Sequence, residues 1–326
     1  PAWARAALAL LAAGAPIAAH HGLLATAPPV FYRERPQLLA LFPVPEAVRL
    51  YVTDHSFGPA AAGSAASAYQ LDQVPVGWPP AASLARAAHQ YLNPPTAARW
   101  GLRGSFDLDI LGFEAPPHRH LIERLRVETD GAAQLRLLRL GSVTHALALL
   151  PAPWWPHARL VAEQSGVFVQ PIRVFEVPDP LPRAYAVLGA RVLGEDAALD
   201  LLASPDFEPR GEVVLLEGTP RPRRGPAGDV RLARAAPDRL SLEADLREDG
   251  FVVVTEAWDA SWRARVDGRA APLLRANLAF RAVPVPAGRH VVELACRPAA
   301  VAWGLLLSGL AAAACAALAW GARGRR

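Results

Sequence analysis

Hydrophobic and polar residues alternate along the stretch that precedes residue 299. Between residues 240 and 246, apolar side chains take every second position (Leu240, Leu242, Ala244 and Leu246). This period of two places apolar and polar side chains on opposite faces of a strand. The alternation returns in residues 262–266, and Asp267-Gly268 is a dipeptide favoured in two-residue hairpin turns. Residues 221–298 are therefore predicted to form an antiparallel β-sandwich domain.

The pattern between residues 26 and 220 is mixed. Strands are predicted over residues 47–53, 183–193 and 212–218, with two more in residues 166–178 on either side of Gln170-Pro171. Helical spacing of apolar residues is found over 81–92, 120–128 and 195–204, and a helix in residues 132–150 is expected to end at Gly141 before a strand begins. We therefore expect an α+β or α/β domain over residues 26–220, joined to the sandwich through a linker at 218–228.

An apolar segment comes directly after the sandwich. Residues 299–322 contain no charged side chain over 24 positions. A helix of that length measures about 36 Å, whereas the hydrocarbon core of a bilayer is about 30 Å thick. Trp303 and Trp320 lie near the two ends, and three arginines come next (Arg323, Arg325 and Arg326). These features predict a transmembrane helix with a cytoplasmic tail at residues 323–326.

The N-terminal residues 1–25 are also apolar, with Arg5 in front of the stretch 6–19. We expect either a transmembrane helix truncated at its start or a signal peptide with a cleavage site at Ala25–Ala27. The absence of Met favours the truncated helix. In both cases the positive-inside rule places the region after residue 25 on the outer side. Residues 26–298 are thus expected outside the cytoplasmic (inner) membrane, flanked by transmembrane helices, with the lipid bilayer as a partner.

Charge and cysteine content exclude several classes of function. The net charge is +4, and four terminal arginines (Arg5, Arg323, Arg325 and Arg326) account for all of it. The exported region is formally neutral, so we expect no nucleic-acid partner, which would require a basic face. Cys296 and Cys315 are too few for a disulfide framework, and no Cys-x-x-Cys motif supports a zinc site. Neither a metal nor a cofactor is predicted.

The candidate site residues are acidic or aromatic, and each has a structural alternative. Asp107 and Asp109 would share one face of a strand, where they would serve acid–base chemistry, bind a metal or form a polar edge. Trp258 and Trp262 would stack on a sugar ring or pack in the core. Trp154 and Trp155 would contact substrate or lipid, or pack in a loop. His118 and His120 offer only two metal ligands, so an exposed helix start is the favoured interpretation.

Several of these residues fall in blocks that resemble the C-terminal region of bacterial YfhO-type membrane proteins. The blocks are Leu181–Ala184, Trp258–Gly268, Arg275–Val283, Gly288–Glu293 and Arg297-Pro298, with a looser upstream match at Asn93, Gly101 and Phe106-Asp107. The resemblance covers about residues 85–320. Two positions depart from the family pattern: Asp259-Ala260 replaces Pro-Gly, and Cys296 replaces an aromatic residue.

The resemblance implies a multi-spanning protein of GT-C-like architecture. Such proteins resemble glycosyltransferases that take a sugar from a polyprenyl-phosphate carrier and pass it to a glycan acceptor of the cell envelope. The family's catalytic acid belongs to an early extracytoplasmic loop, which this chain does not include, so no catalytic residue is assigned. The alternative is a non-catalytic, membrane-anchored surface module that binds a glycan or a protein partner.

Overall fold

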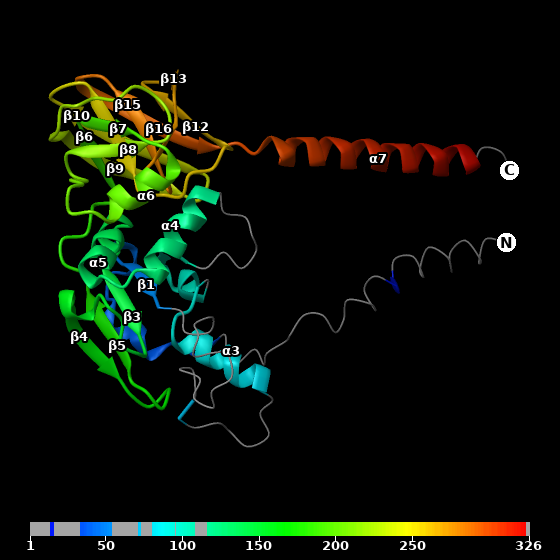
Figure 1. Cartoon of the computed structure of the whole chain (residues 1–326). Coiled ribbons are helices and arrows are strands. Elements are labelled where there is room, and N and C mark those ends of the chain that lie inside the picture. Colours follow the sequence, from blue (N-terminus) through cyan, green and yellow to red (C-terminus); the bar gives the residue numbers. More distant parts are fainter. Residues whose placement is uncertain are drawn as a thin grey trace. The chain divides into compact units, whose positions relative to one another are not determined.

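The computed structural model describes residues 14–15, 33–53, 71–72, 80–94, 96–107 and 116–323 (Figure 1). Over these residues the protein has a mixed α+β fold with two β-sheets, which confirms the mixed class expected from the sequence. The chain divides into two compact units, Pro1–Asp107 with Thr144–Glu176 and Leu108–Val143 with Val177–Arg326. The expected N-terminal span lies outside the described residues, except for positions 14 and 15.

The first unit is built on a five-stranded sheet of order β2-β1-β3-β5-β4. Its strands are β1 (Arg49–Val52), β2 (Arg103–Gly104), β3 (His145–Ala148), β4 (Arg159–Gln164) and β5 (Ile172–Glu176). β1 runs parallel to β2 and β3, whereas β3, β5 and β4 pair in antiparallel fashion. The other described elements are helix α3 (Pro80–Gln90) and the 3-10 helices η1 (Gln37–Leu41), η2 (Pro45–Ala47), η4 (Thr96–Trp100) and η5 (Trp155–His157).

Tyr91 connects the end of α3 to this sheet. Its side chain is fully buried, and its hydroxyl donates to the backbone carbonyls of Thr53 (3.1 Å) and Leu147 (3.2 Å). Its ring forms a T-shaped contact with the ring of Phe168, with a centroid distance of 6.0 Å. Because a buried phenol needs a hydrogen-bond acceptor, these two carbonyls let Tyr91 contribute its large apolar surface to the core.

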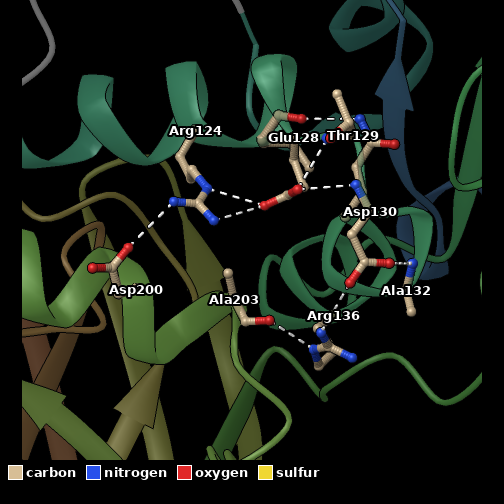
Figure 2. Close-up of polar contacts among 10 residues, drawn as sticks. Arg124, Glu128, Thr129, Asp130, Ala132, Arg136, Asp200 and Ala203 are labelled. Carbon is tan, nitrogen blue, oxygen red and sulfur yellow. Dashed lines mark hydrogen bonds and ion pairs between the residues drawn. The ribbon is translucent and has the colours of Figure 1, made fainter.

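In the second unit, a polar network joins helices α4 (Pro116–Val127), α5 (Gly131–Leu140) and α6 (Glu195–Ala203) (Figure 2). Arg124 donates to Glu128 (2.8 and 3.0 Å) and to Asp200 (3.3 Å). The second carboxylate oxygen of Glu128 accepts the next two backbone N–H groups (2.9 and 3.0 Å). Asp130 caps α5 by accepting from the backbone N–H of Ala132 (2.9 Å). The network therefore holds the α4–α5 corner and links it to α6.

The second unit also contains an 11-stranded curled sheet of order β13-β12-β16-β10-β9-β6-β11-β15-β14-β8-β7. Its strands are β6 (Ala184–Val187), β7 (Gly189–Val192), β8 (Glu212–Leu215), β9 (Pro226–Ala236), β10 (Arg239–Leu246), β11 (Gly250–Val254), β12 (Trp262–Val266), β13 (Arg269–Ala271), β14 (Leu274–Ala276), β15 (Phe280–Val285) and β16 (Gly288–Cys296). All neighbouring strands pair antiparallel except β7 and β8.

The predicted alternation is visible in β10. Leu240, Leu242, Ala244 and Leu246 are buried in one core cluster, whereas Glu243 and Asp245 are exposed. The turn between β12 and β13 places Asp267 at φ +50° and Gly268 at φ +76°. Both values lie in the left-handed region that a two-residue type I′ turn requires, so the predicted hairpin turn is confirmed.

The C-terminal helix α7 (Ala299–Arg323) matches the predicted apolar segment. Residues Ala299–Ala317 have a mean hydropathy of 1.9, and none of them is buried. Trp303 and Trp320 are 63% and 80% exposed. A helix of this length and composition is long and apolar enough to cross a membrane, and its exposed surface distinguishes it from the core helix of a globular domain.

Several local predictions are correct, and others differ from the structure. α5 ends at Leu140, directly before the predicted stop at Gly141, and β3 comes after it. Residues 166–170 were expected to form a strand but contain only an isolated bridge from Phe168 to Leu71. Two separate sheets of a sandwich are not confirmed, because the described strands of the second unit form one continuous sheet. This sheet includes β6, β7 and β8, which lie before the expected boundary at residue 220.

Candidate functional site

The candidate site is a cluster of two tryptophans and three arginines at the end of the 11-stranded sheet where β16 leads into α7. The members of this Trp–Arg cluster are Arg183, Trp258, Trp262, Arg275 and Arg281. Strand register places them at one end: the first residue of β12 pairs with the last residue of β16, and the end of β11 pairs with the starts of β6 and β15. Residues from three separated segments of the chain are therefore brought together.

The hairpin of β14 and β15 places Arg275 directly opposite Arg281. Like charges at opposed positions of a sheet repel each other. The turn that enforces this arrangement is anchored by Asn277, whose buried side chain accepts from the backbone N–H of Val214 at 2.9 Å. Asn277 has φ +47°, a backbone conformation that asparagine tolerates better than most residues. The fold thus holds two arginines side by side.

The segment after β11 brings the two tryptophans onto these arginines. The guanidinium carbon of Arg275 lies 4.0 Å from the ring centre of Trp258, and that of Arg281 lies 3.8 Å from the ring centre of Trp262. Both are cation–π contacts, in which the negative face of the indole offsets part of the positive charge. The backbone N–H of Trp258 donates to Ala279 (2.8 Å) and fixes the segment over the hairpin turn.

Arg281 is the most buried charge of the cluster, with 5% of its surface exposed. Burial lowers its pKa to about 10, although Glu256 and Asp259 favour the charged form. Its Nε and Nη2 atoms donate to the carbonyl of Ala257 (2.9 and 2.6 Å). Its Nη1 atom is buried and has no hydrogen-bond partner among the described residues. A buried cation with an unused donor is energetically unfavourable until an acceptor is supplied.

Two further buried donors belong to the same cluster. Arg183 uses its Nε atom to bind Glu256 (2.6 Å), and its Nη1 atom has no partner among the described residues. The indole Nε1 of Trp258 is likewise buried without one. Burial also lowers the pKa of Arg275. Since guanidinium groups bind phosphate and carboxylate oxygens through charge-assisted hydrogen bonds, the cluster has the chemistry of an anion site bordered by aromatic surface.

The structure places Trp258 and Trp262 in this cluster and the other predicted aromatic pair in the first unit. Trp154 is fully buried, with its ring 5.0 Å from that of Phe175 in an edge-on contact. Trp155 lies 4.9 Å from the same ring, and the guanidinium of Arg173 lies 5.2 Å from Trp155. These contacts agree with the packed-loop interpretation and leave Trp154 no exposed surface for lipid or substrate.

The acidic and histidine candidates do not form a described catalytic or metal group. Asp107 lies just beyond β2, and its Oδ2 atom would lie 2.0 Å from a Cβ placed on Gly104, so the carboxylate occupies the space that a side chain would need. Asp109 lies outside the described residues. His120 hydrogen-bonds Glu195. Within the described part of the chain, no group of three or more His, Cys, Asp or Glu side chains is arranged to hold a metal ion.

Sequence reasoning identified the tryptophans but missed the arginines. Arg275 and Arg281 lie six positions apart, and a hairpin centred on residue 278 places them opposite each other. Two arginines placed symmetrically about a predicted turn could therefore have indicated a cluster of positive charge. Arg183 carried no such signal, because its place in the cluster depends on the pairing of β6 with β11, about 70 residues later in the chain.

Comparison of the chain with protein-family models, with curated proteins and with solved structures finds no match.

Proposed function

We propose that this chain is the membrane-tethered, extracytoplasmic part of a YfhO-type, GT-C-like glycosyltransferase of the cell envelope, and that the Trp–Arg cluster binds its phosphate-bearing substrate. The observation that carries the proposal is Arg281, a buried guanidinium with an unused donor, packed against the face of Trp262. A polyprenyl-phosphate sugar presents an anionic phosphate beside a sugar ring. Guanidinium groups bind the phosphate, and the face of an aromatic ring packs against the apolar C–H face of the sugar.

Two further observations support the proposal. The blocks Trp258–Gly268 and Arg275–Val283, which carry the sequence resemblance, supply four of the five residues of the cluster. The cluster also lies at the sheet end from which α7 departs after only Arg297 and Pro298, close to the region where a lipid-linked substrate would present its phosphate. The catalytic acid is expected in an early loop of the whole protein, so the cluster has a binding role and contains no catalytic residue.

Equilibrium binding of radiolabelled polyprenyl phosphate to the full chain in neutral detergent tests this proposal, with the matching polyprenol as the uncharged probe. In Arg281→Met, an apolar side chain of similar shape replaces the aliphatic part of arginine, and the guanidinium is removed. A hydrogen bond to a charged group contributes about 1.5–3 kcal/mol, so the variant should bind the phosphate about 10–100-fold more weakly. Arg231→Met is the matched control, because Arg231 lies in β9 of the same sheet and is exposed.

Three outcomes would reject the proposal. The first is equal binding of polyprenyl phosphate and polyprenol. The second is an equal loss of phosphate binding in Arg281→Met and Arg231→Met. The third is a Trp262→Phe variant that binds the phosphate no more tightly than Trp262→Ala. The alternative, a non-catalytic glycan-binding module, predicts instead that a neutral oligosaccharide binds at the cluster and that polyprenyl phosphate does not. Circular dichroism of each variant checks that the sheet is retained.

A further inference from the structure

The outer, polar face of the 11-stranded sheet carries two grooves at opposite ends of β10 and β16. The far groove, of about 460 Å³, is lined by residues near the start of β16, including Arg231, Asp245 and Arg289. The second groove, of about 350 Å³, lies near the end of β16. We call the second one the basic groove. Its charged residues are Arg239, Arg263, Arg265, Glu293 and Arg297.

The two grooves differ in how their charges are compensated. In the far groove, Arg231 binds Glu243 (2.6 Å) and Arg289 binds Asp245 (2.9 Å). Among the described residues, the four arginines of the basic groove form no ion pair, and Glu293 is the one carboxylate that lines it. Arg263 and Arg265 donate to backbone carbonyls at 2.6–3.0 Å, which positions their guanidinium groups without neutralising them.

The register of the sheet places this net positive charge close to the start of α7. Arg239 and Arg263 both stand opposite Ala295, and Arg265 stands opposite Glu293. α7 begins at Ala299. At about 3.3 Å per residue, Arg297 lies within about 7 Å of the helix start and the row at Ala295 within about 13 Å. The headgroup layer is about 6 Å thick, and the Debye length is about 8 Å at physiological salt, so these arginines fall in range of the headgroups.

We propose that the basic groove docks the sheet onto the headgroups of anionic phospholipids around α7. Charge complementarity carries the inference, because arginines near a bilayer surface are attracted to anionic lipid, and Glu293 is the one carboxylate that lines the groove beside four arginines. The partner is the bilayer surface itself. The inference does not depend on glycosyl transfer or on the Trp–Arg cluster; it depends on α7 crossing the membrane.

The test compares the association of spin-labelled phosphatidylglycerol and phosphatidylcholine with the full chain in phosphatidylcholine vesicles. Arg263→Glu combined with Arg265→Glu reverses the charge of the basic groove. Arg231→Glu combined with Arg289→Glu makes the same change in net charge on the same face at the far end. An arginine near an anionic surface strengthens binding by about fivefold. The basic-groove variant should therefore lose at least about fivefold of its preference for phosphatidylglycerol, whereas the control should keep it.

High salt should weaken the preference of the wild-type chain in the same direction. An equal loss in both variants would show a general effect of net charge and would overturn the proposal, as would a preference that neither variant changes. Inorganic phosphate is the competing probe. If it saturates the groove in neutral vesicles and abolishes the preference, the groove is a site for free anions and docking is rejected. A negative result here does not bear on the proposal that the Trp–Arg cluster binds polyprenyl phosphate, because that proposal is tested separately with Arg281→Met.

Discussion

Replacing Asn277 with alanine should destabilise the 11-stranded sheet by more than its small loss of surface suggests. The residue is fully buried, and its Oδ1 atom accepts from the backbone N–H of Val214 at 2.9 Å. Its Nδ2 atom donates to the hydroxyl of Tyr185 at 3.4 Å, a phenol whose pKa is raised by burial. The variant leaves the N–H of Val214 without its side-chain acceptor in the core and forces alanine into φ +47°.

The magnitude comes from these two effects. A buried donor without a partner costs about 1–3 kcal/mol, and alanine, which lacks asparagine's tolerance of the left-handed region, is strained there by about 1–2 kcal/mol. We therefore expect Asn277→Ala to lower the free energy of unfolding of the second unit by about 2–5 kcal/mol. Asn277→Gly loses the same acceptor but fits the positive φ, so it should be less destabilising than alanine by about 1 kcal/mol.

Hydrogen exchange of the full chain in detergent, monitored by mass spectrometry, measures the effect where it should occur. Amides of β8, β14 and β15 should exchange faster in both variants, and amides of β3 and β5 in the other unit serve as the internal control. Equal destabilisation by alanine and glycine would refute the conformational part of the reasoning. A loss below about 1 kcal/mol for both would refute the part that concerns the buried hydrogen bond.

Three further predictions concern charge and packing. The hydrogen bond between His290 and Asp267 (2.7 Å) raises the pKa of His290, so Asp267→Asn should lower that pKa in an NMR titration. An unchanged pKa would show that Asp267 is not its cause. The hydrogen bonds that Glu128 accepts lower its pKa, so its stabilising effect is present above about pH 4.5 and is lost as the pH falls. Because Arg124, its ion-pair partner, is partly exposed and glutamine keeps one acceptor oxygen, Glu128→Gln should cost only about 1 kcal/mol at neutral pH and almost nothing in acid, measured by denaturant unfolding. Trp154→Ala, which empties a fully buried site, should cost about 3–5 kcal/mol in the same assay, whereas Trp155→Ala should cost less because Trp155 is not fully buried.

The elements that could be predicted are those whose signal is local. The helix that ends directly before Gly141, the alternating faces of β10, the turn at Asp267-Gly268 and the apolar α7 each depend on residues within a few positions of one another. Period, capping and turn chemistry act at that range. β4 was not predicted, because it lacks such a local signal. It is an edge strand with mostly exposed side chains, so it lacks the alternation that identifies a half-buried strand.

Of the candidate site, the sequence by itself determined that Trp258 and Trp262 are four positions apart in a β-rich segment with an apolar helix beyond it. Only the tertiary structure decided that Arg281 is buried against Trp262 and that Arg183 joins the same cluster. The physical reason is that alternation tells which face of a strand is apolar but not which strand it pairs with. Loop-closure entropy changes only slowly with loop length, so partners many residues apart compete closely, and packing of the whole sheet selects among them.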